Sequence, residues 1–552
     1  MTQRAIIYSE STPQWYDDKR AREIMQAYNS GASSNQPADE FVACSIVPAG
    51  SGSYRDFSYI APDLPEYQAE NCVACMECVQ NCPDSAIWGR VITEEGLSTT
   101  LAAFPEGERE VLQGQVVQTT KFWKTYQKKY EAKPEAERDD TPKGAWFGIF
   151  VDPTKCKGCG ECVTACGEHR ALTMIKKTRD NLPTFFSIWE FYKQSPETPE
   201  AYINPKLKGD LMLRSASNQY VGGAGSCMGC GETSALRQLL AIVHGQVGNK
   251  YGIVANTGCN TVYGSTYPYN PYRAPWVNSL FENAATVAMG IRARWDQMGR
   301  TDHQLLVLGG DGSMLDIGFQ ALSRMLTSGM NIKAIVLDTQ VYSNTGGQAS
   351  TGTFVGQDAK MSVHGSAIHG KQERRKEIGN IAMMHPHTFV AQTVGPMINH
   401  FYKAVEQALQ YDGPALINIY TTCQPEHQVA DDRSCARAVA AVESRAFPVF
   451  IYNPEGGPTL ASRLSLQGNP SVERDWHRRR NKDGSEVMVD FVSFAREEGR
   501  FAKQFDKEGN PSDTLKASMR DRLENWRLLQ ELAGISNVDQ AEELAKRGVG
   551  RR

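Results

Sequence analysis

The cysteines constrain this chain more than any other feature of its sequence. Twelve of the fourteen cysteines fall into three groups, and two of these groups share the spacing Cys-x2-Cys-x2-Cys-x3-Cys. Pro83 directly follows the first of the two runs. Runs with this spacing typically hold 4Fe–4S clusters. The eight residues are Cys72, Cys75, Cys78, Cys82, Cys156, Cys159, Cys162 and Cys166.

The two runs predict a pair of interleaved clusters, as in two-cluster ferredoxins. In such pairs three thiolates of one run hold one cluster, and the fourth reaches across to the other. Structural zinc is the alternative, but zinc usually pairs two Cys-x2-Cys knuckles and needs only four thiolates per ion. Gly167 stands where a second proline is expected, which leaves the exit of that loop open. We assign cluster one to Cys72, Cys75, Cys78 and Cys166, and cluster two to Cys156, Cys159, Cys162 and Cys82.

Composition favours a large enzyme with several domains. The chain has 552 residues, 41% of them hydrophobic, and a net charge of -4 that gives no general attraction to nucleic acid. The first residues lack a signal-peptide core, and the apolar stretches are only as long as strands, so we expect no membrane association. Cluster-binding thiolates fit a reducing compartment, which predicts a cytoplasmic location. Cys44 and Cys435 remain, and we expect both to be buried structural thiols.

The chain divides into four predicted regions. Residues 1–60 form an arm that needs a partner, and residues 61–190 form an α+β ferredoxin-like domain with a long insert at 83–155. Within that insert, residues 121–138 are expected to form a solvated helix. Residues 195–455 form an α/β domain, and residues 456–552 form a C-terminal extension. In the extension, residues 514–533 have the apolar period of an amphipathic helix.

Residues 195–455 alternate apolar strands with helices, which is typical of a doubly wound parallel sheet. We expect a strand at 304–308, a helix at 314–328 and a strand at 332–337. The first strand ends at Gly-Gly-Asp-Gly, residues 309–312, and an Asn-bearing loop follows the second strand at 338–348. Open α/β sheets bind ligands at such strand ends. The pattern favours thiamine diphosphate with magnesium, where Asp311 would bind the metal and glycines would let the backbone approach the diphosphate.

The third cysteine group surrounds this predicted site, and its neighbours carry a family resemblance. The motifs that carry it are residues 60–63 (Ile-Ala-Pro-Asp), 229–233 (Gly-Cys-Gly-Glu-Thr), 278–282 (Asn-Ser-Leu-Phe-Glu) and 341–348 (Val-Tyr-Ser-Asn-Thr-Gly-Gly-Gln). With them, the segment from about 55 to 455 resembles the C-terminal half of the pyruvate enzymes in the 2-oxoacid:ferredoxin oxidoreductase family.

The resemblance implies a third 4Fe–4S cluster beside thiamine diphosphate. Its ligands would be Cys227, Cys230, Cys259 and Cys423. Magnesium would be bound by Asp311, the Thr339 hydroxyl and the Val341 carbonyl. The residues lining the thiamine cofactor would be Glu232, Cys259, Gly312, Ser313, Met314, Gln340, Tyr342, Ser343 and Asn344.

The resemblance also implies a reaction and partners. A 2-oxoacid would lose carbon dioxide on thiamine, three clusters would pass the electrons to a ferredoxin or flavodoxin, and coenzyme A would take the acyl group. The glutamate that activates thiamine, with most substrate and coenzyme A contacts, is expected on a second subunit. We do not assign that role to Glu232. The chain would therefore be catalytic only with its partner, as a dimer of heterodimers.

Several alternatives stay open. Pyruvate is favoured because the cluster and thiamine domains are fused, but 2-oxoglutarate remains an alternative substrate. The chain could also be a non-catalytic electron-transfer subunit, or a thiamine decarboxylase that releases aldehyde without reducing an acceptor. The basic run at 476–482 favours docking to a partner subunit or an acidic ferredoxin over nucleic-acid binding.

Overall fold

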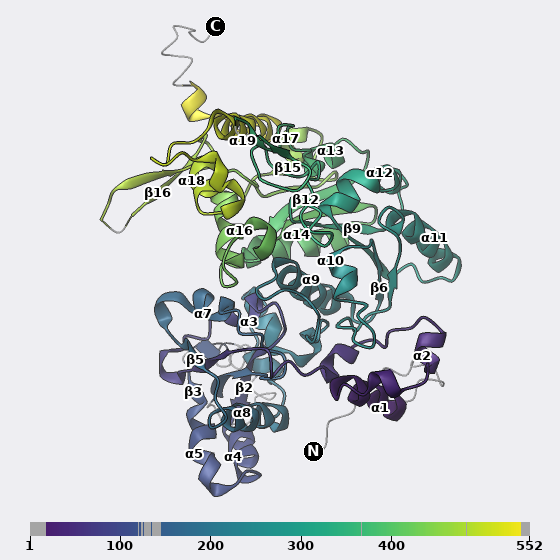
Figure 1. Cartoon of the computed structure of the whole chain (residues 1–552), viewed down its shortest axis with the longest axis vertical. Helices are drawn as coiled ribbons and strands as arrows, with labels where there is room; N and C mark the ends of the chain where they lie inside the picture. Colours follow the sequence, from purple (N-terminus) through teal and green to yellow (C-terminus); the bar gives the residue numbers. More distant parts are fainter. Residues whose placement is uncertain are drawn as a thin grey trace.

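A computed structural model describes residues 18–119, 121, 122, 125, 128, 134, 145–365, 367–481 and 483–541 of this chain. Figure 1 shows a ferredoxin-like unit in blue below a larger unit built on a sheet, with the C-terminal extension in yellow at the top. Most of the helix predicted at 121–138 lies outside the described residues. The region boundaries predicted near 60, 190 and 455 remain predictions.

The larger unit is built on one eight-stranded sheet with the order β15-β14-β12-β13-β9-β8-β6-β7. The six strands from β12 to β7 run parallel, whereas β14 and β15 are antiparallel at one edge. The bounds are β6 Tyr251–Ala255, β7 Trp276–Asn278, β8 Gln304–Gly310, β9 Lys333–Asp338, β12 Phe389–Val394, β13 Ala415–Tyr420, β14 Phe450–Tyr452 and β15 Leu464–Ser465. The predicted α/β fold class is confirmed, with a mixed rather than wholly parallel sheet.

Helices cover both faces of this sheet, which is why its central strands are apolar along their whole length. One core joins Leu239 and Phe401 to the sheet, and the other joins Ala288, Leu322 and Ile378. The helices of the first face are α9 (Gly231–Val247) and α14 (Ile398–Gln410), and those of the second are α11 (Ala284–Gln297), α12 (Phe319–Leu326) and α13 (Ile378–Met383).

The strands expected at 304–308 and 332–337 are present as β8 and β9, but the helix expected at 314–328 is divided. A π-helical turn, η9 (Gly312–Ile317), comes first, and α12 begins only after Gly318. A Cβ on Gly318 would lie 2.6 Å from the Ser313 carbonyl oxygen, so the chain turns tightly there. Single π turns inside helices are frequent at functional sites.

The ferredoxin-like unit has two small antiparallel sheets and the expected α+β character. Strand β1 (Asp63–Tyr67) pairs with β5 (Leu172–Lys176), and each cysteine run leads into a short helix, α3 (Glu77–Asn81) or α7 (Glu161–Cys166). The second sheet has the order β2-β4-β3. Its elements and the covering helices are β2 Ile87–Thr93, β3 Val116–Gln118, β4 Ala145–Val151, α4 Glu94–Ala102, α5 Glu106–Gly114 and α8 Leu182–Gln194.

The described part of the N-terminal arm packs against other residues of its own chain, although the sequence predicted that the arm needs a partner. In α1 (Asp18–Asn29) the ring of Tyr28 lies 5.7 Å from that of Tyr267, and Ile24 is buried against Phe41. Cys44 is exposed, so its predicted burial was wrong: helix α2 (Glu40–Ala43) buries Phe41 and ends immediately before it. Cys435 is half-buried.

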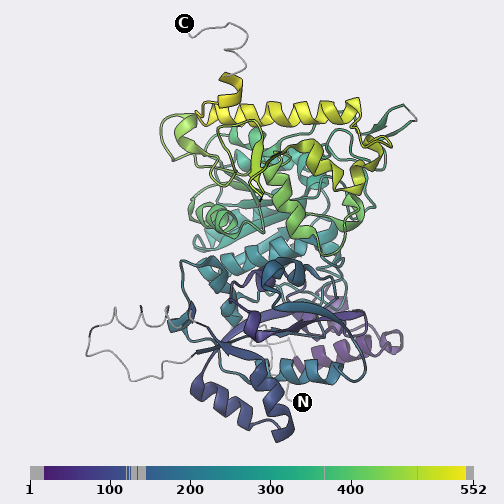
Figure 2. The ribbon, with the colours of Figure 1, turned by 90° about the vertical axis from the view of Figure 1, so that its left-hand side faces the viewer.

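The C-terminal extension lies across the end of the sheet unit that is remote from the ferredoxin-like unit, as Figure 2 shows. Its long helix α19 (Asp513–Leu532) confirms the amphipathic helix predicted at 514–533. The basic run forms strand β16 (His477–Arg480), which pairs with β17 (Glu486–Val489) in an exposed hairpin. Within the described ranges, none of the helices combines the length and the apolar content that crossing a membrane requires.

Candidate cofactor pocket and cysteine sites

A pocket of about 390 Å³ opens where β6, β8 and β9 end, beside the start of α9. Nine of the twelve residues predicted to contact thiamine diphosphate or its magnesium line this pocket: Glu232, Cys259, Gly312, Ser313, Thr339, Val341, Tyr342, Ser343 and Asn344. Thr257, Asn260, Phe281 and Thr345 also line it and were not predicted. The ends of neighbouring parallel strands are where open sheets bind ligands.

The other three predicted residues, Asp311, Met314 and Gln340, are buried behind the pocket wall. Asp311 Oδ1 accepts hydrogen bonds from the Thr339 amide at 3.2 Å and from the Thr339 hydroxyl at 3.1 Å. That hydroxyl also lies 3.1 Å from the Val341 carbonyl oxygen. The structure therefore brings the three predicted magnesium ligands together, and all three are the hard oxygen donors that magnesium prefers.

Charge in this region also fits a bound cation. Burial, and then the nearby carboxylate of Asp338, raises the pKa of Asp311. Two buried carboxylates in proximity need a compensating positive charge to ionise together. Arg375 forms a fully buried ion pair with Asp338, whereas Asp311 accepts hydrogen bonds from the Thr339 and Ser350 hydroxyls.

Backbone geometry explains one residue of the pocket wall, Gly312, and one residue buried behind it, Gln340. A Cβ on Gly312 would lie 2.4 Å from the ring of Tyr342, so only glycine fits there. Gln340 has a φ of 58°, which places it in the left-handed region that non-glycine residues rarely occupy. This turn lies between Thr339, whose hydroxyl donates to Asp311, and Val341, whose carbonyl oxygen accepts from the same hydroxyl.

Glu232 lies in the first turn of α9 and lines the pocket. The Tyr263 hydroxyl donates to its Oε2 atom at 3.2 Å. Burial raises the pKa of Glu232 to about 7. The carboxyl group thus sits where it can contact a ligand from the α9 side, as the resemblance implies.

The four dispersed cysteines of the third group converge beside this pocket. Cys230 immediately precedes α9, Cys259 begins α10 (Cys259–Val262), and Cys423 follows β13. Burial, with smaller contributions from charges that include Cys227, raises the pKa of the Cys423 thiol to about 12. Burial likewise raises the pKa of Cys259, with contributions from the other three thiols. Cys259 also lines the pocket, so this residue belongs both to the pocket wall and to the third cysteine group.

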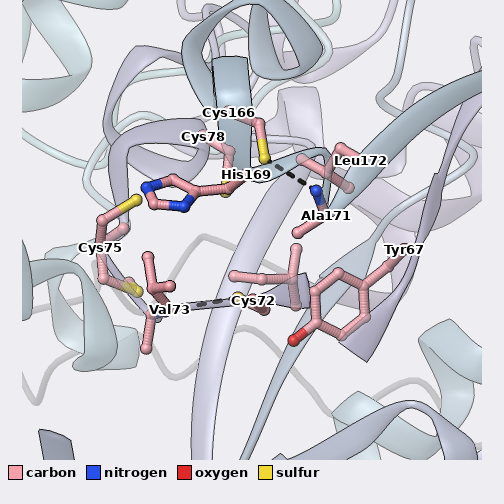
Figure 3. Close-up of a pocket in the computed structure, with 12 residues that line it drawn as sticks. Tyr67, Cys72, Val73, Cys75, Cys78, Cys166, His169, Ala171 and Leu172 are labelled. Atoms are coloured by element: carbon pink, nitrogen blue, oxygen red, sulfur yellow. Dashed lines mark hydrogen bonds between the residues drawn. The ribbon is translucent and has the colours of Figure 1, made fainter. Parts of the chain in front are cut away.

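The eight ferredoxin-like cysteines form two separate cavities of about 350 and 370 Å³. Figure 3 shows the first, where the labelled cysteines surround the cavity with Tyr67 and His169. The cysteines of the first cavity are Cys72, Cys75, Cys78 and Cys166, and those of the second are Cys82, Cys156, Cys159 and Cys162. This grouping is the interleaved one that the spacing predicts, and cluster ligation itself remains a prediction. Although four cysteines line each cavity, the described part of the chain has no three His, Cys, Asp or Glu side chains close enough together to hold a single metal ion.

Backbone amides point at the sulfurs, which fits anionic clusters. The Ala74 amide lies 3.4 Å from Cys72 Sγ, and the Ala171 amide lies 3.2 Å from Cys166 Sγ (Figure 3). In the second cavity the Ala86 amide lies 3.3 Å from Cys82 Sγ. Such hydrogen bonds stabilise thiolates and tune the potential of clusters that they hold.

Buried cations link the second cavity to the third cysteine group and to α9, and these links were not predicted from the sequence. Lys157 Nζ pairs with Asp84 at 2.7 Å and donates to the carbonyl oxygen of Ser226, next to Cys227, at 2.8 Å. Arg237 of α9 donates to the carbonyl oxygens of Cys82 and Ile87, both at 3.2 Å. The ferredoxin-like unit is thus fixed to the helix that begins at the pocket.

Comparison with known proteins agrees with this geometry. Residues 256–419 match the family model "Thiamine pyrophosphate enzyme, C-terminal TPP binding domain". The chain is 25% identical to pyruvate-flavodoxin oxidoreductase of Rhodospirillum rubrum, over 88% of this chain and 43% of that protein. It is 26% identical to pyruvate:ferredoxin oxidoreductase of Moorella thermoacetica, over 79% of this chain and 40% of that protein.

A shorter relative gives a stronger match. Pyruvate synthase subunit PorB of Pyrococcus furiosus is 34% identical over 45% of this chain and 79% of the subunit. The chain spans less than half the length of the two longer relatives. With its thiamine-binding fold and the coverage of PorB, this chain belongs to the 2-oxoacid:ferredoxin oxidoreductase family and corresponds to the C-terminal half of its pyruvate enzymes.

Proposed function

We propose that this chain is the thiamine- and cluster-bearing subunit of a pyruvate oxidoreductase. The reversible reaction would convert pyruvate, coenzyme A and oxidised ferredoxin or flavodoxin into acetyl-CoA, carbon dioxide and the reduced carrier. The observation that carries this proposal is the shared wall: Cys259 lines the cofactor pocket and also lies among the four thiols of the third cysteine group. A non-oxidative decarboxylase has no need of an electron acceptor at that position.

Bound thiamine diphosphate would supply the nucleophilic carbon and electron sink, and three 4Fe–4S clusters would supply one-electron acceptors. The residues of this chain would position these groups. Asp311, Thr339 and Val341 would hold magnesium, and Gly312 would let the backbone approach the diphosphate. Glu232 would contact the cofactor from the α9 side.

The cysteine sites suggest a path for electrons out of the pocket. The third cysteine group adjoins the second cavity through Lys157, and the two ferredoxin-like cavities are interleaved through Cys82 and Cys166. Cys75 of the first cavity is exposed. An external ferredoxin or flavodoxin would therefore collect electrons at the first cavity.

Apolar side chains exposed near the pocket support a second subunit. Leu280, next to the pocket residue Phe281, is 61% exposed, and Ile317 at the end of η9 is 57% exposed. Exposed apolar groups that cluster around a site often mark an interface. We propose that the partner covers this rim and supplies the activating glutamate and most coenzyme A contacts, in a cytoplasmic dimer of heterodimers.

The test is anaerobic purification of the chain with its partner, followed by metal analysis and assay. We expect about twelve irons per chain, four for each of the three proposed clusters, together with bound thiamine diphosphate and reduction of methyl viologen that requires pyruvate and coenzyme A. A panel of 2-oxoacids, including 2-oxoglutarate, identifies the substrate. Release of aldehyde without viologen reduction would reject the proposal in favour of a simple decarboxylase.

Two cysteine variants sharpen that test. Cys259→Ser should lower the iron content to about eight per chain, because one of three clusters loses a ligand, and should abolish viologen reduction. Cys44→Ser is the control, since Cys44 is exposed and lies in none of the three cysteine groups. Equal iron content in both variants would contradict the assignment of the third group.

A further inference from the structure

One buried arginine of the C-terminal extension contacts the loop that follows β9, where the proposed magnesium ligands lie. Arg500 lies in the short helix η10 (Gly499–Gln504), and its side chain is fully buried. Its Nη1 atom donates to the side-chain oxygen of Gln340 at 2.9 Å and to that of Gln357 at 3.2 Å. Its Nη2 atom donates to the Tyr420 hydroxyl at 3.0 Å. A residue 160 positions away in sequence therefore holds the side chain of Gln340.

The backbone conformation of Gln340 sets the positions of its neighbours in the proposed magnesium site. This backbone is left-handed, with φ at 58°, a conformation that is strained for a side chain other than glycine. Such a conformation persists only where surrounding contacts fix it. It lies between Thr339 and Val341, the residues whose oxygens approach each other to 3.1 Å. The Thr353 hydroxyl holds the Gln340 carbonyl oxygen at 2.6 Å, and Arg500 holds the side chain.

Arg500 is itself fixed by the extension. Glu498 accepts from its Nε atom at 2.6 Å and is anchored in turn by Arg437 at 3.0 Å. The ring of Phe491 lies 5.4 Å from that of Phe354, and the Arg500 guanidinium lies 5.5 Å from the Phe354 ring. Because Phe354 directly follows Thr353, the aromatic packing supports the same loop.

A second arginine of the extension approaches the loop from another element. Arg522 of α19 pairs with Glu377 at 2.6 Å, and Glu377 lies 3.4 Å from Arg375 Nε. Arg375 forms the buried ion pair with Asp338, which directly precedes Thr339. Two chains of contacts thus run from the extension to the residues on either side of Thr339.

We propose that the C-terminal extension is a brace for the metal and diphosphate loop, and that Arg500 is the positioning residue that holds Gln340 in its left-handed turn. This inference rests on the proposed magnesium–thiamine diphosphate site. Arg500 contacts neither metal nor substrate, so its effect is on the affinity for the cofactor pair. A purely structural arginine would instead change the stability of the cofactor-free protein without changing that affinity.

The experiment compares Arg500→Met, Arg500→Lys and Arg496→Met in the complex purified anaerobically and freed of thiamine diphosphate. Arg496 is the matched control, because it lies in the same extension and stacks on Phe505 at 4.6 Å with no contact to the loop. Manganese(II) replaces magnesium, and its dissociation constant in the presence of thiamine diphosphate is measured by electron paramagnetic resonance.

We expect Arg500→Met to raise the manganese dissociation constant at least tenfold and to shrink the thermal shift that the cofactors produce. Arg500→Lys should restore part of the affinity, since an ammonium group can still donate to Gln340. Arg496→Met should bind as the wild type does. A folded Arg500→Met complex with wild-type affinity would overturn the inference, whereas a wild-type complex that binds neither ligand would overturn the proposed function instead.

A variant on the loop side keeps the test decisive if Arg500→Met does not fold. Gln340→Met removes the acceptor but leaves Arg500 its contacts with Gln357, Tyr420 and Glu498. It should raise the dissociation constant as Arg500→Lys does or more, and the double variant should show less than the product of the two effects. Unchanged affinity in Gln340→Met, or independent effects in the double variant, would reject the brace.

Discussion

At the scale of single residues, the turn between Cys227 and Cys230 depends on one glycine. Gly229 has a φ of 70°, and a Cβ added to it would lie 1.9 Å from the carbonyl oxygen of Asp431. Both the backbone conformation and the close approach exclude other residues. The two cysteines can therefore face Cys259 and Cys423 only while this position remains glycine.

If the three proposed clusters are present, Gly229→Ala should lower the iron content from about twelve to about eight per chain, because one cluster would lose its ligand geometry. Gly225→Ala is the control, since a Cβ there would meet its nearest neighbour at 3.6 Å and the residue has no positive φ. Iron analysis of the two anaerobically purified variants checks the prediction. Twelve irons in Gly229→Ala would show that the turn tolerates a side chain.

Residue types and spacing predicted most of the site but not the groups that support it. The cysteine spacing predicted the interleaved grouping, and the Gly-Asp-Gly turn located Asp311 at the end of β8. Lys157, Arg237 and Arg500 were missed because each acts through contacts with residues 60 or more positions away, as in the pairing of Lys157 with Ser226. No local pattern reports such a contact.

At the scale of elements, α14 carries a half-buried histidine, His400, against the sheet. His400 Nδ1 lies 2.9 Å from the hydroxyl of Thr393 in β12. Burial, and then the nearby Lys403, lowers the pKa of His400 to about 4. A folded-state pKa below the unfolded value of about 6.5 means that stability is complete above pH 6.5 and is lost as the pH falls toward 4.

His400→Gln should therefore remove part of the acid sensitivity of the fold. The histidine is expected to cost about 2 kcal/mol between pH 7 and pH 5, since protonation is favoured in the unfolded chain. Thermal unfolding at the two pH values checks this: the decrease in melting temperature should be smaller in His400→Gln than in the wild type. An equal decrease would show that His400 titrates normally.

Periodicity predicted the central elements well and the edges poorly. Strands β8 and β9 were predicted because apolar runs flanked by glycine or polar loops are typical of buried parallel strands. The antiparallel strands β14 and β15 are only three and two residues long, too short for a periodic signal. The break at Gly318 depends on packing against Glu282, which is remote in sequence.

At the scale of the whole molecule, helix α9 joins the two units. Its first turn carries Glu232 at the pocket. About one turn later, Arg237 donates hydrogen bonds to backbone carbonyl oxygens of the ferredoxin-like unit. The Arg237 guanidinium also lies 4.7 Å from the ring of Trp88. A buried arginine that loses such partners is strongly destabilising, so these contacts fix the position of the unit.

Arg237→Met should loosen the ferredoxin-like unit around residues 79–87 without unfolding the sheet. Hydrogen exchange followed by mass spectrometry should show faster exchange there. Arg292→Met is the matched control, because Arg292 is equally buried but its contacts are with Asp296, Arg300, His303 and the ring of Trp295, all nearby in sequence. Faster exchange of 79–87 in both variants would indicate general destabilisation rather than loss of this link.

The path of α9 also limits how the molecule can work. Swinging the ferredoxin-like unit outward on a hinge would pull Arg237 from its three carbonyl acceptors and leave a charge stranded in apolar surroundings. These contacts therefore oppose a swinging motion of the ferredoxin-like unit relative to α9. If the proposed electron transfer takes place, a soluble carrier would have to come to the unit in this fixed position.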